Sequence, residues 1–342
     1  MFKNYLKIAW RNLIKRKVFT TINVLGLAIG ISCSCLILLW AEDEINYDSV
    51  FAKQDLIHFA LTNHNFDDGI ATFDDTPGPL AHDLKEEIPE ITRAARTSNQ
   101  ELLLSKGDNG INRTGTFVDP DFLDIFGLRF VEGEAKDVLD RPDAIVLTQK
   151  TALALFGENV PAMDQVIKIN NEHNFTVRGV VADLPHNVTF GFEFLLPFES
   201  YGFGEDVSWA ENYANNFTNT FVELAPNADF DKVDAKVRAM IPSKLDASKN
   251  NADTYAFLHS IKDWHLRSEF QDGKIVGGQI TLVRLMLWIA AIILIIACIN
   301  FINLSTAQSE KRGKEVGVRK VLGSQREGLV SQFMVEENAR AS

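Results

Sequence analysis

Two long runs without a charged residue, 18–41 and 285–309, constrain the fold of this chain more than any other feature. A helix needs about 20 apolar residues to cross a bilayer, and both runs are longer than that. The first run also exceeds the apolar core of a cleaved signal peptide, which has about 7–15 residues. We therefore predict two transmembrane helices, 18–41 and 285–309, on either side of one long segment, 42–283.

The charges of the 342-residue chain, −12 in total, are unevenly distributed. Six basic residues and no acidic residue lie in 1–17, a basic stretch follows the second apolar run, and the middle segment is strongly acidic. Cytoplasmic flanks of transmembrane helices are rich in Lys and Arg. The pattern therefore predicts that both termini are cytoplasmic and that 42–283 is exported. An acidic exported segment argues against a nucleic-acid partner.

The cysteines and histidines give no indication of a metal site. Cys33, Cys35 and Cys298 lie inside the apolar runs, so the exported segment has neither a disulfide framework nor a thiolate site. His259 and His265 are six residues apart, which matches no known ligand spacing, and we expect surface or half-buried histidines. We predict no metal and no cofactor.

Catalytic motifs are also missing from the sequence. Asp183 and His186 could form an acid–base pair, but a carboxylate just after a strand more often caps a turn, and no nucleophile motif accompanies it. No GxxxxGK[ST] sequence occurs, so the chain does not bind ATP through a P-loop. We therefore predict that the chain is not an enzyme.

The exported segment repeats one order of elements. The pattern predicts strands near 55–62 and 93–104 around a helix at 78–88, and strands at 218–225 and 253–261 around a helix at 228–240 capped by Asn227. Two such units predict an α+β membrane protein whose two transmembrane helices flank an exported, two-lobed α/β domain. Lobe 1, about 50–112 and 218–270, is a split βαβ sandwich, and lobe 2, about 113–217, is a strand-rich insertion.

The insertion has recognisable elements of its own. Its sequence predicts helices at 119–127 and 150–157, strands at 144–148 and 192–198, and a hairpin over 165–183 that turns at Asn170 and Asn171. The aromatic stretch 201–217 has two interpretations. It could contact a partner or an apolar substrate, or it could be a long loop that packs its rings back onto the domain, which we favour.

The ends of the apolar runs carry further signals. Residues 1–17 read as an amphipathic helix that lies on the cytoplasmic membrane surface, and 42–48 as a continuation of the first helix above the membrane. Gly26 and Gly30 form a GxxxG motif that permits close helix packing. Asn300 and Asn303 are polar residues near the inner end of the second run and could hydrogen-bond to neighbouring helices.

A basic stretch, 311–323 (KRGKEVGVRKVLG), follows the second apolar run directly. It reads as a short cytoplasmic helix with Val316, Arg319 and Lys320 on one face and Gly323 as a C-cap. It could be an ordinary positively charged flank, or it could be a docking element for a cytoplasmic partner.

The sequence of this stretch resembles that of the segment after the second span in FtsX/MacB-like permeases of ABC transporters. Other matches to that family are INVLGLAIGIS in the first apolar run, Leu155-Phe156-Gly157, and the pattern V-x-GVV-x-D-x-P that begins at Val177. The resemblance implies a MacB-like periplasmic core domain and a coupling helix in 310–342. It implies that the coupling helix contacts the ATPase through Lys314, Glu315, Val316, Gly317, Arg319, Lys320 and Gly323.

The resemblance also implies a function. A permease of this kind transmits ATP hydrolysis by a separate cytoplasmic ABC ATPase to an exported domain, which acts on a lipid, a peptide or a drug. The implied partners are the ATPase, a second permease copy in a homodimer or heterodimer, membrane lipid and a periplasmic adaptor. The implied location is the bacterial inner membrane, as a multi-pass protein. The family continues into third and fourth spans, so the chain is either a fragment of a longer permease or a two-span form.

Two other classes of protein remain as alternatives. A two-span anchored sensor would bind a ligand outside and signal inward, but no sustained heptads follow the second run to carry a signal. A membrane-anchored exported enzyme would need a catalytic constellation, which the sequence does not contain.

Overall fold

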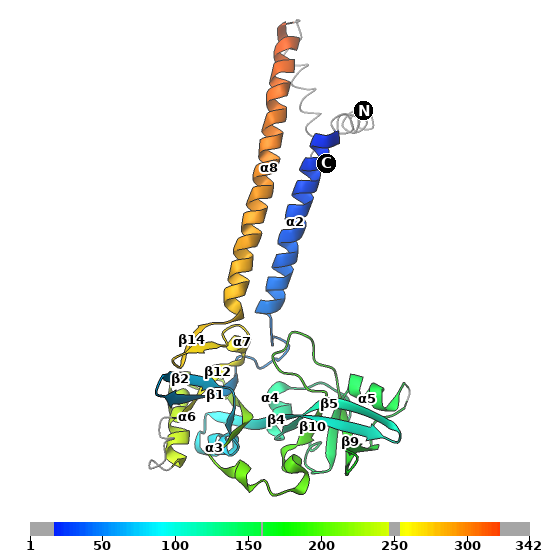
Figure 1. Ribbon diagram of the computed structural model, residues 1–342, viewed down its shortest axis with the longest axis vertical. Helices are drawn as coiled ribbons and strands as arrows, with labels where there is room; N and C mark the ends of the chain where they lie inside the picture. The colour runs from blue at the N-terminus through cyan, green and yellow to red at the C-terminus, as the bar shows by residue number, and fades with distance from the viewer. Residues whose placement is uncertain (1–16, 159, 246–253, 322–342) are drawn as a thin grey trace. The chain divides into compact units, whose positions relative to one another are not determined.

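The computed structural model describes residues 17–158, 160–245 and 254–321, which form two compact units. One unit consists of two long helices and takes in residues up to Asp43 and from Leu282 onward. The other is a globular domain, Glu44–Thr281. The fold class is confirmed, because a mixed α/β domain lies in the chain between two apolar helices (Figure 1).

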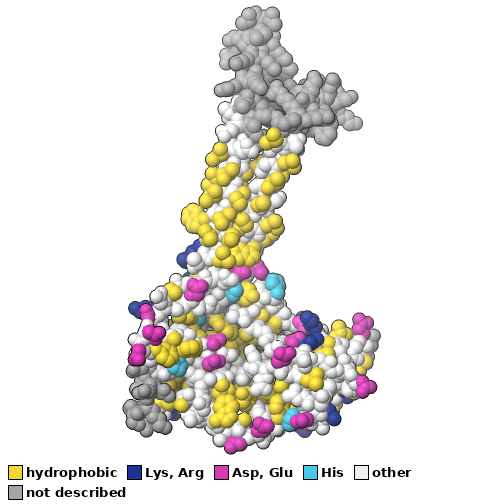
Figure 2. Space-filling model, viewed as in Figure 1, with side chains coloured by type: hydrophobic (Ala, Val, Ile, Leu, Met, Phe, Trp, Pro, Cys, Tyr) yellow, Lys and Arg dark blue, Asp and Glu magenta, His cyan; other side chains and the backbone are white. Residues whose placement is uncertain are grey.

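The helical unit contains most of α2 (Lys17–Ile45) and of α8 (Gln279–Val321), whereas Glu44, Ile45 and residues 279–281 belong to the globular domain. Both are long and apolar enough to cross a membrane, over Val24–Ile45 and Gln279–Asn303. Figure 2 shows many hydrophobic side chains on the visible surface of these segments. α8 is one continuous helix of 43 residues, so the short helix expected over 311–323 is, as far as Val321, the end of the long helix.

The first part of the domain contains the two predicted β–α–β units. The first runs through β1 (Ile57–Phe66), α3 (Leu80–Glu87) and β4 (Ile91–Lys106), and the second through β11 (Asn216–Leu224), α6 (Phe230–Lys244) and β12 (Tyr255–Ser260). The strands interleave in the order β12-β1-β11-β4, with all neighbours antiparallel. Asp229, not Asn227, caps α6, because its side chain accepts the N–H of Lys232 and the helix begins two residues later than expected.

Both helices of these units cover one face of the sheet, as their apolar spacing predicts. Leu80 and Leu84 of α3 and Val233 and Val237 of α6 are fully buried in one cluster with strand residues such as Val222. Two small strands extend this part of the sheet: β2 (Gly69–Phe73) pairs with β1, and β3 (Thr76–Pro77) pairs with β11.

The second part of the domain is a closed ring of strands. The sheet continues from β4 through β5 (Asn109–Val118), β10 (Phe194–Pro197), β7 (Ala144–Thr148) and β9 (His173–Val181). β8 (Val166–Ile169) pairs with β9 on one side and with β4 on the other, which closes the ring. β6 (Phe130–Glu132) pairs with β9 outside it. A single sheet therefore runs through both predicted lobes, and the expected boundary at 112/113 falls inside β5.

The elements of the insertion agree with the sequence. α4 (Asp121–Phe126) ends at Gly127, which has a left-handed backbone, and α5 (Gln149–Phe156) is followed by Gly157. The hairpin is confirmed, because β8 and β9 pair antiparallel. Asn170 and Asn171 both have positive φ, as the two central residues of a type I′ turn require. The chain returns to the second apolar helix through α7 (Ile261–Trp264), β13 (Glu269–Gln271) and β14 (Lys274–Gly277).

The aromatic stretch 201–217 packs against the domain, as we favoured. It includes the end of η1 (Phe198–Gly204) and η2 (Ser208–Glu211). The aromatic ring of Tyr201 stacks on that of Phe198, with their centroids 5.2 Å apart. It also lies 5.3 Å from the ring of Phe117, which is in the core of the closed ring of strands. Trp209 remains 46% exposed, although it lies 4.7 Å from Phe217.

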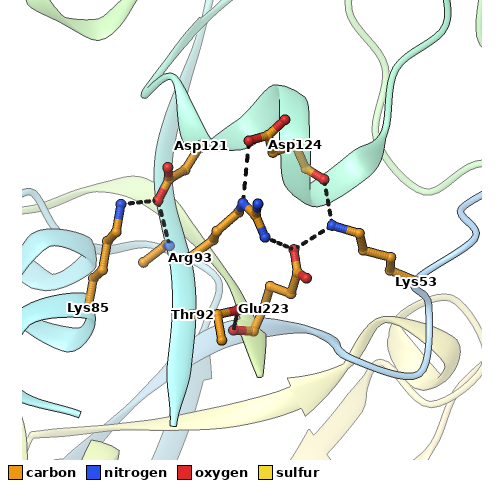
Figure 3. A network of polar contacts seen from close by, with 8 residues as sticks. Lys53, Lys85, Thr92, Arg93, Asp121, Asp124 and Glu223 are labelled. Carbon is orange, nitrogen blue, oxygen red and sulfur yellow. Dashed lines mark hydrogen bonds and ion pairs between the residues drawn. The ribbon is translucent and has the colours of Figure 1, made fainter. Parts of the chain in front are cut away.

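An ion-pair network holds α4 in place (Figure 3). Glu223 of β11 accepts hydrogen bonds from Lys53 at 2.9 Å and from Arg93 of β4 at 3.3 Å. Arg93 also pairs with Asp124 of α4, and Lys53 donates to the Asp124 carbonyl. The carboxylate of Glu223 is almost fully buried, so these contacts offset its desolvation. They fix the helix that contributes Phe122 and Phe126 to a cluster of aromatic rings.

Two buried histidines predict how the stability of the domain depends on pH. Burial lowers the pKa of both His58 and His259 below the ordinary value of 6.5. Below about pH 6.5 the unfolded chain therefore binds protons that the folded domain does not, and the free energy of unfolding falls as the pH falls. Each histidine contributes up to about 1.4 kcal/mol per pH unit in this window.

Replacing His259 by Phe is expected to flatten this pH dependence, as measured by urea unfolding of the full chain in detergent between about pH 7.5 and about pH 5. His259 is 4% exposed, and its Nε2 has no hydrogen-bond partner among the described residues. The control is His82→Phe, because His82 is exposed on α3. An unchanged pH dependence in His259→Phe would contradict this assignment.

Candidate functional site at the ends of the apolar helices

The residues predicted for helix packing meet in the helical unit. α2 and α8 run antiparallel, and a Cβ added to Gly30 would lie 2.6 Å from the Cβ of Ala297. A Cβ on Gly26 would lie 3.1 Å from the Asn300 side-chain nitrogen. One turn beyond Gly30, the buried Ser34 hydroxyl donates to the Ala290 carbonyl at 3.1 Å. Small residues thus let the two backbones approach closely. Asn303 is exposed.

The last turn of α2 is bonded into the globular domain. Glu44 and His265 form a pair at 2.5 Å, and both side chains are mostly buried. The ring of Tyr47 stacks on His265 at 3.6 Å with an angle of 10° between the planes, and its hydroxyl donates to the His186 carbonyl. His265, which follows α7, therefore binds the end of α2 through Glu44 and the turn after α2 through Tyr47. We call Glu44, Tyr47 and His265 the junction clamp.

Asp48 fastens the same segment to the loop that follows β9. It is fully buried and has a φ of 59°, so the chain turns sharply here. Its carboxylate accepts the backbone N–H and the hydroxyl of Thr189, and its own N–H donates to the Asn187 carbonyl at 2.9 Å. Burial raises the pKa of Asp48, although the bonds from Thr189 oppose that rise. The expected stalk 42–48 is helical only to Ile45.

The first turn of α8 is also tied to this region of the domain. The Ile280 N–H donates to the Leu266 carbonyl at 3.0 Å, directly after His265. Gly278 has a φ of 138°, and a Cβ there would lie 2.6 Å from the same carbonyl, so only glycine fits between β14 and the helix. Residues 265 and 266 therefore contact the end of one apolar helix and the start of the other.

The clamp has no counterpart in the sequence predictions. His265 is half-buried as expected, whereas His259 is buried, contrary to expectation. Nothing in the sequence links Glu44 to His265, which lie 221 positions apart. The only signal was the acidic stretch after the first apolar run. The arrangement holds the end of α2 and the start of α8 on one short segment, residues 265 and 266.

The remaining predicted residues lie elsewhere. Lys314, Glu315, Val316, Gly317, Arg319 and Lys320 fall in the last turns of α8, and Gly323 lies outside the described residues. Asp183 accepts the N–H of Lys150 at the start of α5, so this carboxylate binds the backbone of a helix terminus. In the described ranges no group of three possible metal ligands occurs.

Comparison with known proteins identifies relatives of this architecture. The profile of the MacB-like periplasmic core domain matches residues 20–240. The macrolide export ATP-binding/permease protein MacB of Salmonella paratyphi A is 22% identical over 98% of this chain and 50% of its own length. The protein of the same name from Burkholderia lata is 24% identical over 98% of this chain and 47% of its own. The chain thus spans about half the length of these curated relatives.

A solved structure shares the fold of the domain. A domain of a putative permease from Porphyromonas gingivalis superimposes with a TM-score of 0.54 and 22% sequence identity, and the match covers 61% of this chain and 91% of that one. The similarity places the described β–α–β units and strand ring in the same fold as that permease domain.

Proposed function

Because this chain belongs to the MacB-like periplasmic core domain family of ABC transporter permeases, we propose that it couples ATP hydrolysis by a cytoplasmic ATPase to movement of its periplasmic domain. The family and the two apolar helices make it an inner-membrane protein with a large periplasmic segment. Permeases of this family work with an ATPase. In the proposed arrangement the ATPase is a separate subunit, both termini are cytoplasmic, and two permease copies act together.

The continuity of α8 is the observation that carries the proposal. The helix begins at Gln279, where its first turn is bonded to Leu266 of the domain, and ends at Val321, beyond the basic residues 311–320. At 1.5 Å per residue its 43 residues measure about 65 Å. A bilayer with its headgroups is only about 40–45 Å thick. An unbroken helix of this length can therefore carry a displacement from a cytoplasmic contact to the domain.

Through the junction clamp, α2 would move together with α8. The pair of Glu44 with His265 binds the end of α2, and the stack of Tyr47 on His265 binds the turn after it, to the residue beside Leu266. A tilt of either helix would therefore displace the segment that holds the other. In this proposal His265 is a positioning residue, because it touches only the chain itself.

What the protein moves is proposed only by class: a lipid, a peptide or a drug. The curated relatives are named for macrolide export, which is a property of those proteins. Residues of both charges line the described pockets, such as Arg96 and Asp119 in one of them. We therefore propose that the work is done by movement of the whole domain, with an adaptor as a further periplasmic partner.

Hydrogen–deuterium exchange of the permease–ATPase complex tests this coupling. Trapping the ATPase with ATP and vanadate, compared with ADP, is expected to change exchange in peptides covering 44–48 and 263–281. His265→Ala is expected to reduce this difference several-fold while the ATPase still co-purifies. His82→Ala replaces an exposed histidine of α3 and is the matched control. Identical exchange of the domain in both nucleotide states would contradict the proposal.

A further inference from the structure

Three exposed aliphatic side chains of the domain lie close in sequence to the apolar helices. Val50, Ile275 and Val276 are 55%, 46% and 59% exposed. α2 ends at Ile45, five residues before Val50, and α8 begins at Gln279, three residues after Val276. We call Val50, Ile275 and Val276 the aliphatic collar. The described contacts inside the protein leave about half of each side chain uncovered.

We take the candidate span Gln279–Asn303 to be centred in the bilayer, which sets the depth of its first residue. The apolar part of α8, Gln279–Asn303, has 25 residues, or about 37 Å at 1.5 Å per residue. The hydrocarbon core of a bilayer is about 30 Å thick, and the headgroup layers bring the total to about 40–45 Å. A centred span therefore places Gln279 just outside the hydrocarbon, in the headgroup layer. Val276 is three residues away.

The fold holds the β13–β14 hairpin close to the first turn of α8. β14 pairs with β13, whose Phe270 packs at 5.8 Å against the ring of Phe257 in the domain. Gly278 fits closely against the Leu266 carbonyl, and Ile280 of the first helical turn is bonded to the same carbonyl. Ile275 and Val276 are therefore held at a fixed height relative to the start of α8.

We propose that the aliphatic collar sits in the headgroup layer of the membrane that α2 and α8 cross. Aliphatic side chains at this depth are removed from water without entering the membrane core. Lys274, exposed beside Ile275, suits the same place, because a lysine can extend its ammonium group to lipid phosphates. The inference depends on the spans crossing a bilayer and not on any ATPase or transported compound.

Spin labels measure the depth directly in the full chain. Cys33, Cys35 and Cys298 are first replaced by alanine, and Val276→Cys and Val50→Cys are then labelled in liposomes of phosphatidylethanolamine and phosphatidylglycerol. Apolar oxygen and a water-soluble nickel chelate are used as relaxation agents. We expect the ratio of oxygen to nickel accessibility at both sites to be several-fold higher than at Val131→Cys. Val131 is 46% exposed on β6 and is distant in sequence from either span.

Leu285→Cys, 54% exposed within the apolar part of α8, marks the value for the hydrocarbon core. A collar ratio between those of Val131 and Leu285 supports the proposal. A ratio equal to that at Val131 places the collar in water, and a ratio equal to that at Leu285 places it in the hydrocarbon; either overturns the proposal. Protection from both agents would show that a second copy covers the collar, which also overturns it. Ile275→Cys repeats the test independently.

Discussion

Replacing Arg319 by Glu is expected to abolish capture of the ATPase by this permease while leaving the chain inserted in the membrane. Arg319 lies in the last turns of α8, in the stretch that resembles the coupling helix of related permeases. A charge reversal sets like charges against each other at an interface, which costs several kcal/mol. Because about 1.4 kcal/mol corresponds to a tenfold change, we expect affinity to fall by about a hundredfold or more.

The matched control is Lys311→Glu. It makes the same change of charge in the same helix and alters the basic flank equally, so any effect on membrane orientation is shared. At 100° per residue, position 311 lies about 135° around the helix from the face that contains Val316, Arg319 and Lys320. Capture is measured by co-purification of the ATPase with tagged permease. Normal capture by Arg319→Glu would contradict the docking role.

Replacing Gly30 by Ala is expected to lower the stability of the α2–α8 pair by about 2 kcal/mol, because overpacking a close contact costs about 1–3 kcal/mol. The added methyl group would lie 2.6 Å from the Cβ of Ala297. Ala297→Gly removes that methyl group from the facing helix, so the double variant should recover most of the loss. The measurement is unfolding of the full chain in mixed micelles with increasing dodecyl sulfate.

Gly26→Ala serves as the comparison within the same motif. Its added methyl group would lie 3.1 Å from the end of the Asn300 side chain, which can rotate away. Its cost should therefore be well below that of Gly30→Ala. Equal costs at the two glycines, or no recovery with Ala297→Gly, would show that the close contact does not stabilise the pair.

Local patterns in the sequence predicted most of the elements of the domain. The prolines at 79 and 89 that bound α3, the apolar spacing of α6 and the Asn170–Asn171 turn are all signals between residues close together in the chain. Each of these elements was found within a few residues of its expected place. The stretch 311–321 was less well predicted. We expected a short separate helix over 311–323, but a glycine inside a helix costs only about 1 kcal/mol, and α8 continues through Gly313 and Gly317 to Val321.

Contacts between distant segments could not be predicted. The pairing of β8 with β4 follows no periodic signal, because each strand alone fits an ordinary hairpin. The junction clamp joins Glu44 to His265, and no motif in the sequence around either residue marks the contact. The sequence thus indicated most of the helices and strands, although not, for example, β5, β6, β13 or β14. The site depends on how the strand ring and the β–α–β units bring distant segments of the domain together.

The long strand β4 has a consequence for how the domain unfolds. Its 16 residues span about 53 Å at 3.3 Å per residue. Residues 91–97 pair with β11 of the β–α–β units, whereas Leu104 and Ser105 pair with β8 and close the strand ring. Unfolding of either the β–α–β units or the strand ring would remove hydrogen bonds from β4, on which the other part also depends. The domain should therefore lose its structure in a single cooperative transition, without a stable half-folded state to expose to periplasmic proteases.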